Sequence, residues 1–459
     1  MQTKEDNDIL TRVGPGTPMG ELFRRFWLPA LLSDELPGPD CTPVRARLLG
    51  EDLIAFRDSE GRVGVVDAYC PHRSAPLFFG RNEEGGLRCI YHGWKFDVDG
   101  KCVDMPNCIE GESFKTKVNI PSYHAWEGGG MVWIYMGPAA KMPPKPAYEW
   151  LDVPAENRYI QKYMLNCNYL QTLENEFDIG HSAWLHSNLV QRRPNPNRQG
   201  MTVRNPKIAD YTNTWIVDTE FGSALIRKME GSTDTTDVYS FGTPFWLPSF
   251  SAAGAASALG IFPLNLKLPV DDEHSVFFRL KWSEKSIPAS IIYDYKHGNN
   301  EFPQNVPGTY VPIQNKSNDY MIDRVKQRFF SWTGIINYPL QDFAVVENQR
   351  GAITDRTKEH LCSSDTYLLH MRWRLLNAAK ALMRGEEPTE PWNPEAFRIR
   401  MRQLAVPAGT PKDEVIRLFL HPEEAEKAGP SVKMIEVQHA MQVTPTGQAL
   451  IVEKEPLAV

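Results

Sequence analysis

The amino-acid sequence predicts two domains, a mainly β domain near the N-terminus and a larger α+β domain after it. Residues from about Val44 to Met136 form short β-rich runs separated by turns that contain Asp and Gly, which is typical of a small antiparallel sheet. A proline-rich passage over 137–146 cannot continue a helix or a strand and therefore marks a linker. Beyond it, strands are followed by helices rather than alternating with them, which favours an α+β domain with an antiparallel sheet.

These observations divide the chain into an N-terminal segment (1–43), a β domain (44–137), a linker (138–165) and an α+β domain (166–459). The length of 459 residues suffices for two domains with substantial cores. Periodicity and turn residues predict strands over 44–57, 63–69 and 94–98 and across most of 211–282, and helices over 166–189, 319–330, 340–351 and 363–383.

Charge and composition exclude several classes of protein. The formal net charge is -7, from 50 basic and 57 acidic residues that are scattered along the chain, so nucleic acid is not an expected partner. No apolar stretch is long enough to span a bilayer, and the polar residues 1–6 do not resemble a signal peptide. We therefore expect a soluble, cytoplasmic protein. The seven cysteines show no spacing that indicates a disulfide framework.

Two Cys-His pairs lie in the predicted β domain, Cys70 with His72 and Cys89 with His92. Each pair is short enough to come from one tight loop. Such a set can hold a 2Fe-2S cluster in which two thiolates bind one iron and two imidazoles bind the other, which raises the reduction potential. The alternative is a tetrahedral zinc site, although zinc modules usually place two cysteines or two histidines together on one side. The pattern favours electron transfer.

A second group of metal-binding side chains is predicted near the start of the α+β domain. Polar residues at 168, 171, 175, 178 and 182 would form one stripe on a helix. Asp178 and His181 share this face, but His186 follows five residues later, so the two histidines can bind one ion only if the helix ends or bends between them. Two histidines and one carboxylate are typical of an iron that activates dioxygen. The alternative is a helix with two hydrogen-bonded histidines.

The carboxylate must come from elsewhere in the chain, and we choose Asp342. The pattern alone leaves Glu347, Asp355 and a helix-capping role open. Glu174 and Asn175, one turn before Asp178, are candidates to support the metal ligands, with ordinary buried polar residues as the alternative. Four basic residues are candidates to hold a substrate carboxylate, with solvated surface as the alternative: Arg192, Arg193, Arg198 and Arg204.

Together these motifs resemble the α subunits of Rieske non-heme iron ring-hydroxylating oxygenases. The opening residues 11–29 resemble the phthalate dioxygenase-like branch, which includes monooxygenases and aryl-ether O-demethylases of lignin-derived aromatic acids. The resemblance implies an N-terminal Rieske domain and a C-terminal helix-grip (START-like) catalytic domain. It also implies a 2Fe-2S cluster on Cys70, His72, Cys89 and His92, and a mononuclear Fe(II) on His181, His186 and Asp342.

The resemblance further implies the terminal component of a multicomponent oxygenase, which uses dioxygen and electrons from a separate reductase, with or without a ferredoxin. The sequence has no nucleotide-binding glycine motif and no Cys-x4-Cys-x2-Cys run, so the chain is not expected to oxidise NADH itself. The expected reaction is O-demethylation or hydroxylation of an aromatic carboxylic acid, with cis-dihydroxylation as the alternative. A non-enzymatic electron carrier is the alternative from another class. Related enzymes form trimers in which Asp178 would connect a cluster histidine of one subunit to His181 of the next.

Overall fold

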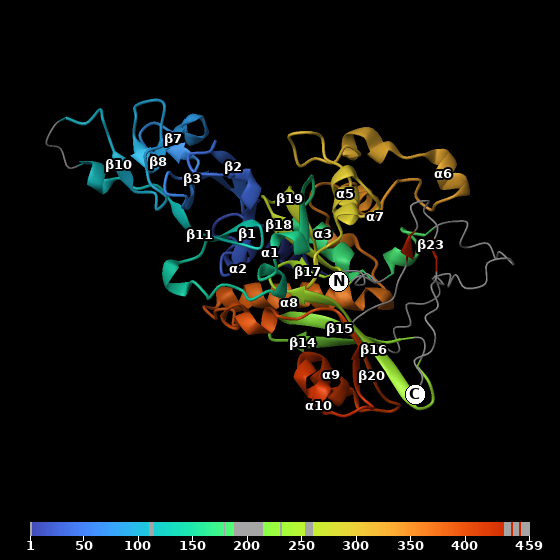
Figure 1. Cartoon of the computed structure of the whole chain (residues 1–459). Helices are drawn as coiled ribbons and strands as arrows, with labels where there is room; N and C mark the ends of the chain where they lie inside the picture. Colours follow the sequence, from blue (N-terminus) through green and yellow to red (C-terminus); the bar gives the residue numbers. More distant parts are fainter. Residues whose placement is uncertain are drawn as a thin grey trace.

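The computed structural model describes residues 2–109, 114–178, 180–187, 214–229, 232–252 and 260–435, with the backbone of 442–443 and 449–450. Figure 1 shows a smaller β region at one end, from which the chain continues into a larger region of sheet and helices. Within the described part of the chain, no helix has the length and apolar character needed to cross a membrane.

The β region contains a six-stranded antiparallel sheet in the order β1-β12-β11-β4-β3-β2. Its strands are β1 (Trp27–Leu32), β2 (Val44–Leu48), β3 (Glu51–Arg57), β4 (Val63–Asp67), β11 (Ser122–Gly128) and β12 (Met131–Tyr135). The turn between β3 and β4 forms because Asp58, which is fully buried, accepts hydrogen bonds from the main-chain N–H groups of Glu60 and Arg62. The sheet thus follows the predicted hairpin pattern.

A smaller four-stranded sheet, in the order β10-β9-β8-β7, lies beside it. Its strands are β7 (Arg81–Glu83), β8 (Gly86–Arg88), β9 (Lys95–Phe96) and β10 (Cys102–Asp104), and the short pair β5 (Tyr69–Cys70) and β6 (Ala75–Pro76) precedes it. A second hydrophobic core includes Leu77, Leu87 and Phe96 of this part together with Ile54 and Phe56 of β3. The Cys-His loops are therefore mounted on a core that is distinct from the main one.

The larger region contains a nine-stranded sheet with the main order β13-β19-β18-β17-β16-β15-β14. Its strands are β13 (Arg158–Leu165), β14 (Thr214–Thr219), β15 (Gly222–Lys228), β16 (Thr236–Trp246), β17 (Phe250–Ser251), β18 (Phe262–Pro269), β19 (Ser275–Trp282), β20 (Arg402–Pro407) and β21 (Lys433–Ile435). A separate short pair is β22 (Gln442–Val443) and β23 (Ala449–Leu450). All pairings that join the strands are antiparallel, as the α+β prediction requires.

Helices surround this sheet (Figure 1). They are α1 (Lys4–Thr11), α2 (Pro18–Phe23), α3 (Tyr169–Phe177), α5 (Ala289–His297), α6 (Arg324–Phe329), α7 (Tyr338–Val346), α8 (Thr366–Met383), α9 (Lys412–Leu420) and α10 (Pro422–Lys427). The long helix α8 packs against α1 and α2. Helix α3 packs on α8 through Phe177 and Tyr367, whose ring centroids are 5.1 Å apart.

Two predicted details differ from the structure. The helix expected over 166–189 ends at Phe177, and the reason lies in Asp178, described below. Strands β1 and β13 form in stretches that we expected to be an N-terminal segment and a linker. Each of them pairs at the edge of a sheet, β1 with β12 and β13 with β19. The division of the chain at residues 43, 137 and 165 stays a prediction.

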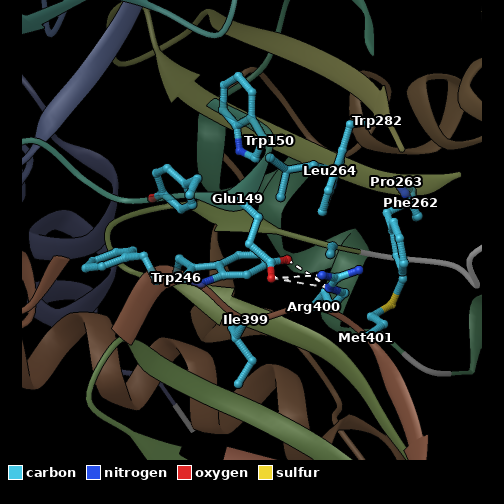
Figure 2. Close-up of a pocket in the computed structure, with 13 residues that line it drawn as sticks. Glu149, Trp150, Trp246, Phe262, Pro263, Leu264, Trp282, Ile399, Arg400 and Met401 are labelled. Atoms are coloured by element: carbon cyan, nitrogen blue, oxygen red, sulfur yellow. Dashed lines mark hydrogen bonds and ion pairs between the residues drawn. The ribbon is translucent and has the colours of Figure 1, made fainter. Parts of the chain in front are cut away.

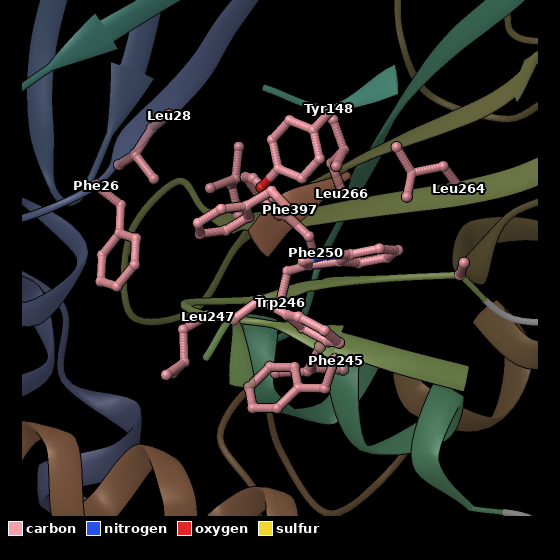
Figure 3. Packing of buried hydrophobic residues seen from close by; sticks show 14 of the residues in the cluster. Phe26, Leu28, Tyr148, Phe245, Trp246, Leu247, Phe250, Leu264, Leu266 and Phe397 are labelled. Carbon is pink, nitrogen blue, oxygen red and sulfur yellow. The ribbon is translucent and has the colours of Figure 1, made fainter. Parts of the chain in front are cut away.

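The main hydrophobic core connects the two regions. Figure 3 shows Phe26, just before β1, and Leu28, within β1. They lie close to Tyr148 of the connecting segment and to Trp246 and other side chains of the large sheet. The Trp133 and Tyr148 rings stack at 6.2 Å between centroids, which fixes the connecting segment against β12. Burial of each such aromatic side chain stabilises the fold by about 1.5–3 kcal/mol. The shared core therefore holds the β region on the large sheet.

Candidate metal centres

The first candidate centre consists of two loops in the β region. Cys70 ends β5, and its carbonyl accepts a hydrogen bond from Ser74 N–H at 2.9 Å. The second loop is closed by Cys89, whose N–H donates to the Trp94 carbonyl at 2.8 Å and whose carbonyl accepts from Gly93 N–H at 3.0 Å. Gly93 has a positive φ of 78°, and a Cβ there would lie 2.7 Å from Pro106. Tight local turns therefore present both Cys-His pairs.

The four side chains converge at the ends of these loops. Cys70 and Cys89 are only 1% and 2% exposed, and the ring centroids of His72 and His92 are 4.4 Å apart. The Nδ1 atom of His72 is buried and has no hydrogen-bond partner among the described residues. A buried imidazole nitrogen without a partner beside two buried thiols is the donor set of a 2Fe-2S cluster with mixed ligands.

Protonation acts in opposite directions on the two kinds of ligand. Burial raises the pKa of Cys70 to about 11, and the neighbouring Cys89 adds to this rise. The pKa of His92 is lowered by loss of solvation and by the nearby His72 and Arg73, so its imidazole is neutral. Because the thiolate is the metal ligand, loading a cluster must release the thiol protons that burial otherwise retains.

The second candidate centre begins where α3 ends. The Asp178 carboxylate Oδ1 accepts hydrogen bonds from Gly180 N–H at 2.8 Å and from His181 N–H at 3.2 Å. These bonds satisfy N–H groups that a continued helix would have used, and a short 3-10 turn follows over His181–Ala183. The chain therefore bends before His186. This bend is the condition under which the two histidines can share one ion.

The third side chain comes from α7. Asn337 caps this helix by accepting a hydrogen bond from Leu340 N–H at 3.1 Å, and Pro339 fits the first turn. The Asp342 Oδ1 lies 3.3 Å from His186 Nε2 and 3.7 Å from His181 Nε2. One ligand atom from each of the three residues lies within 4.8 Å of the others. The structure thus brings together the three predicted side chains.

The state of Asp342 fits an anionic metal ligand. Burial alone would raise the pKa of the Asp342 carboxyl, but the imidazoles of His186 and His181 and the nearby Asn175 amide lower it below its ordinary value. Its Oδ1 atom is buried and has no hydrogen-bond partner among the described residues. An ionised carboxylate oxygen that faces two imidazoles and lacks a hydrogen bond suits a cation between them.

Each histidine is oriented by an acceptor on its other ring nitrogen. The Nδ1 of His181 lies 2.7 Å from the Asp178 carbonyl oxygen, and the Nδ1 of His186 lies 2.7 Å from the Oε1 of Gln341. Both acceptors favour the tautomer with N–H at Nδ1, so the Nε2 lone pairs point toward Asp342. The Gln341 amide is itself held by donating to the Ile335 carbonyl at 2.9 Å. These contacts fix the rings as metal ligands require.

Family models match both parts of the chain. The model described as "Rieske [2Fe-2S] domain" matches residues 26–123, and "LigXa C-terminal domain like" matches residues 134–410. The phthalate 4,5-dioxygenase oxygenase subunit of Pseudomonas putida is 35% identical, over 84% of this chain and 88% of that protein. The 5,5'-dehydrodivanillate O-demethylase oxygenase subunit of Sphingobium sp. is 30% identical, over 94% of this chain and 91% of that protein.

The chain belongs to the Rieske oxygenase α subunits. The fold agrees, because a structure of Pseudomonas putida CBB5 NdmA (QL mutant, with caffeine) aligns with a TM-score of 0.56 at 18% identity, over 82% of this chain and 96% of that chain. The predicted family, fold class and oxidoreductase activity are confirmed. A 2Fe-2S cluster and a mononuclear non-heme iron are the cofactors of this oxygenase.

Within one chain, the main-chain carbonyl of Asp178 and not its carboxylate accepts the His181 ring N–H, and the carboxylate Oδ2 lies 3.8 Å from Nδ1. The predicted connection by Asp178 between two subunits stays a prediction. The carboxylate instead forms the turn that ends α3, and its side chain is 33% exposed. Asp178 therefore shapes the His181 turn within this chain and remains accessible from outside.

Other predicted residues are placed away from the three facing side chains. Both carboxylate oxygens of Glu174 bind Arg356, at 2.6 and 2.9 Å, which makes it a buried structural ion pair. Glu347 accepts from the main chain of Asn166, and Asp355 caps a turn by accepting from Thr357, so the alternatives to Asp342 are engaged elsewhere. The four arginines proposed for a substrate carboxylate lie outside the described residues: Arg192, Arg193, Arg198 and Arg204.

An aromatic-lined pocket elsewhere in the molecule is too small for a substrate. Figure 2 shows Trp150, Trp246 and Trp282 around it, with the Glu149–Arg400 ion pair at 3.0 Å across one side. The cavity has a volume of about 20 Å³. That volume accommodates roughly one water molecule. The three facing side chains His181, His186 and Asp342 lie outside this pocket.

Proposed function

We propose that the chain is the terminal oxygenase component that uses dioxygen and electrons from a separate reductase to O-demethylate or hydroxylate an aromatic carboxylic acid. The observation that carries this proposal is the convergence of His181, His186 and Asp342 in a chain that also presents two Cys-His pairs with buried cysteines. When bound, the cluster relays electrons and the mononuclear iron activates dioxygen.

The protein side chains prepare the site for this chemistry. We assign the iron ligands to the Nε2 atoms of the two histidines and to the Asp342 carboxylate, a set that leaves coordination positions open. The Asp178 carbonyl and the Gln341 amide hold the two rings in place. The Oδ1 atom of Asp342 is buried, whereas the side chain as a whole is 24% exposed.

Demethylation is our preferred reaction, in which hydroxylation of a methoxy carbon is followed by collapse to a phenol and formaldehyde. The alignment with the O-demethylase subunit supports demethylation, since this alignment extends over 94% of the chain. Cis-dihydroxylation is the second candidate, and it is supported by the higher identity, 35%, to the phthalate dioxygenase subunit. Both reactions use the same arrangement of ligands.

We also propose a homotrimer in which the cluster of one subunit serves the iron of the next. Figure 1 shows β7, β8 and β10 at one end of the molecule, away from α3 and α7. Apolar side chains are exposed beside both centres, with Tyr91 53% exposed next to His92, and Trp184 and Trp332 44% and 41% exposed near His186. A contact between these surfaces would place the accessible Asp178 between the two centres. Sedimentation equilibrium should give the mass of three chains.

Oxygen uptake with a reductase, NADH and a panel of methoxylated and non-methoxylated aromatic acids tests the function. We expect substrate-dependent oxygen uptake and formaldehyde in proportion to it. Uptake with a diol product and no formaldehyde would replace demethylation by dihydroxylation. No coupled uptake with any aromatic acid, in protein that contains both iron centres, would contradict the proposed substrate class.

A further inference from the structure

The sheet face beneath α3 and α7 carries a row of three cationic side chains. In the register of β18 and β19, Asn265 pairs with Arg279 and Lys267 pairs with Phe277. Because side chains alternate between faces along a strand, Arg279 and Lys281 share one face with Lys267. Such a row in the interior of a protein needs compensating anions.

Both lysines of the row have their own carboxylate. Lys267 Nζ lies 2.6 Å from Glu176 in α3, and Lys281 Nζ lies 3.0 Å from Glu301. The two lysines are only 3% and 6% exposed, so these pairs are shielded from water. Asn265 also donates to the Glu176 carboxylate, at 3.0 Å. The charges of Lys267 and Lys281 are thus balanced within the protein.

Arg279, between them, is not balanced in this way. No carboxylate of the described residues lies within 4.0 Å of its guanidinium. Its Nε atom is buried without a hydrogen-bond partner among those residues, and its Nη1 reaches the Asn265 amide oxygen only at 3.5 Å. Arginine stays ionised and offers five N–H donors in a planar fork. The guanidinium also lies over the Phe302 ring, 5.7 Å from its centroid, and its charge acts on Glu301. The Nε donor is left for a ligand.

The position of Arg279 connects it to the iron site. Helix α7 places Phe343, the residue after Asp342, against Phe277 and Tyr163 on the same sheet face, with ring centroids 5.8 and 5.7 Å apart. Lys267 lies close enough to both Asp342 and Arg279 for each charge to act on it. Arg279 on the sheet and Asp342 on the helix are thus both near Lys267.

We propose that Arg279 binds the carboxylate of the aromatic acid, and so orients the ring toward the three iron ligands. This assignment rests on the proposed function and specifies its substrate subsite. A planar carboxylate accepts two parallel hydrogen bonds from a guanidinium fork, and it would supply the charge that the row lacks. Arg279 is then a residue that determines specificity for acids over neutral aromatics.

Isothermal titration calorimetry of the iron-loaded protein tests this role, with 3-methoxybenzoate and the neutral 3-methoxybenzamide as probes. We expect the wild type to bind the acid more tightly than the amide, by about 30-fold or more, as for a shielded charge pair. Arg279→Gln should remove this preference by weakening acid binding and leaving amide binding unchanged. Arg279→Lys, which keeps the charge but loses the fork, should restore part of it.

Arg158→Gln is the matched control. Arg158 lies on the adjacent strand β13 but on the opposite face, and its guanidinium donates to the Val153 carbonyl. Its substitution should leave the preference for the acid intact. Equal binding of acid and amide by the wild type would overturn the proposal, even if Arg279→Gln fails to fold. An unchanged preference in Arg279→Gln would also overturn it.

The Arg279 subsite and the proposed function can be refuted separately. Oxygen uptake with aromatic acids, together with a preference that does not depend on Arg279, would refute the subsite and leave the function standing. A lack of uptake with both probes and with the aromatic acid panel would refute the function itself.

Discussion

The two metal centres differ in how the chain builds them. The cluster ligands lie close together in sequence, on one turn between β5 and β6 and another between β8 and β9, beside a second hydrophobic core. The iron site joins the end of α3 to α7, and Gln341, which orients His186, follows it by 155 residues. The first centre therefore depends mainly on local turn geometry. The second depends on how a nine-stranded sheet positions two helices against each other.

The largest expected effects come from removing one ligand at each centre. His181→Ala should abolish substrate-coupled oxygen uptake and remove one iron per chain, while the visible absorption of the cluster remains. Cys89→Ser should also abolish coupled uptake, but by removing the cluster with its visible absorption while the mononuclear iron remains, because its loop packs separately from α3 and α7. Metal analysis and absorption spectra measure both. If His181→Ala retained all three irons, the ligand assignment would be wrong.

The next effect concerns the anchoring of α3. Glu174→Gln would leave the buried Arg356 without a carboxylate and Arg372 with Glu359 alone, which should lower the free energy of unfolding by about 3–5 kcal/mol. Urea denaturation measures this change. The exposed Glu5→Gln is the matched control and should leave the unfolding free energy nearly unchanged. An equally small effect of both variants would show that the buried ion pairs do not anchor the helix.

Glu174→Gln should also change how the free energy of unfolding depends on pH. Burial alone would raise the pKa of Glu174, but Arg356 and Arg372 outweigh it and lower that pKa. Because its pKa is lowered in the folded state, ionised Glu174 contributes its full stabilisation above its unfolded-state pKa of about 4.3. This stabilisation is lost as the pH falls through the folded-state pKa. The wild type should therefore lose stability below about pH 4.3 more steeply than Glu174→Gln. Parallel stability curves would contradict this.

Asp178→Asn separates the two roles of that residue. The Asn side-chain oxygen can still accept from Gly180 and His181, so the turn and the bound iron should remain. Only the negative charge between the proposed neighbouring centres is lost, and we expect turnover to fall by about 100-fold. Iron content and oxygen uptake, measured together, test this. Full turnover in Asp178→Asn would reduce Asp178 to a helix-ending residue.

The smallest effect is expected at Gln341. Gln341→Leu removes the acceptor for His186 Nδ1–H, and iron affinity should fall by about 10-fold. Gln341→Glu keeps an acceptor at the same place and should retain iron in competition with a chelator. Equal iron loss from Gln341→Leu and the wild type would show that packing alone orients His186.

The comparison also explains what the sequence could predict. The cluster residues were evident because ligands on one tight turn leave a short, fixed spacing. Asp342 was one of several acidic candidates, and only the capping of α7 by Asn337 and the packing of that helix bring it to His181 and His186. Their roles as ligands stay predictions, although the structure brings all three together.

Other residues left no readable signal. The helix expected over 166–189 was too long, because Asp178 takes up the N–H groups of Gly180 and His181 and ends it at Phe177. Gln341 and Arg279 looked like ordinary residues of a helix and a strand. Their importance depends on which partners they have or lack after distant segments have packed.

One chain holds both a 2Fe-2S cluster and a separate mononuclear iron. Iron, acid-labile sulfide and zinc per chain, measured together in freshly purified protein, test this most directly. We expect three irons, two sulfides and no stoichiometric zinc. Two irons with two sulfides, or zinc in place of iron, would contradict it.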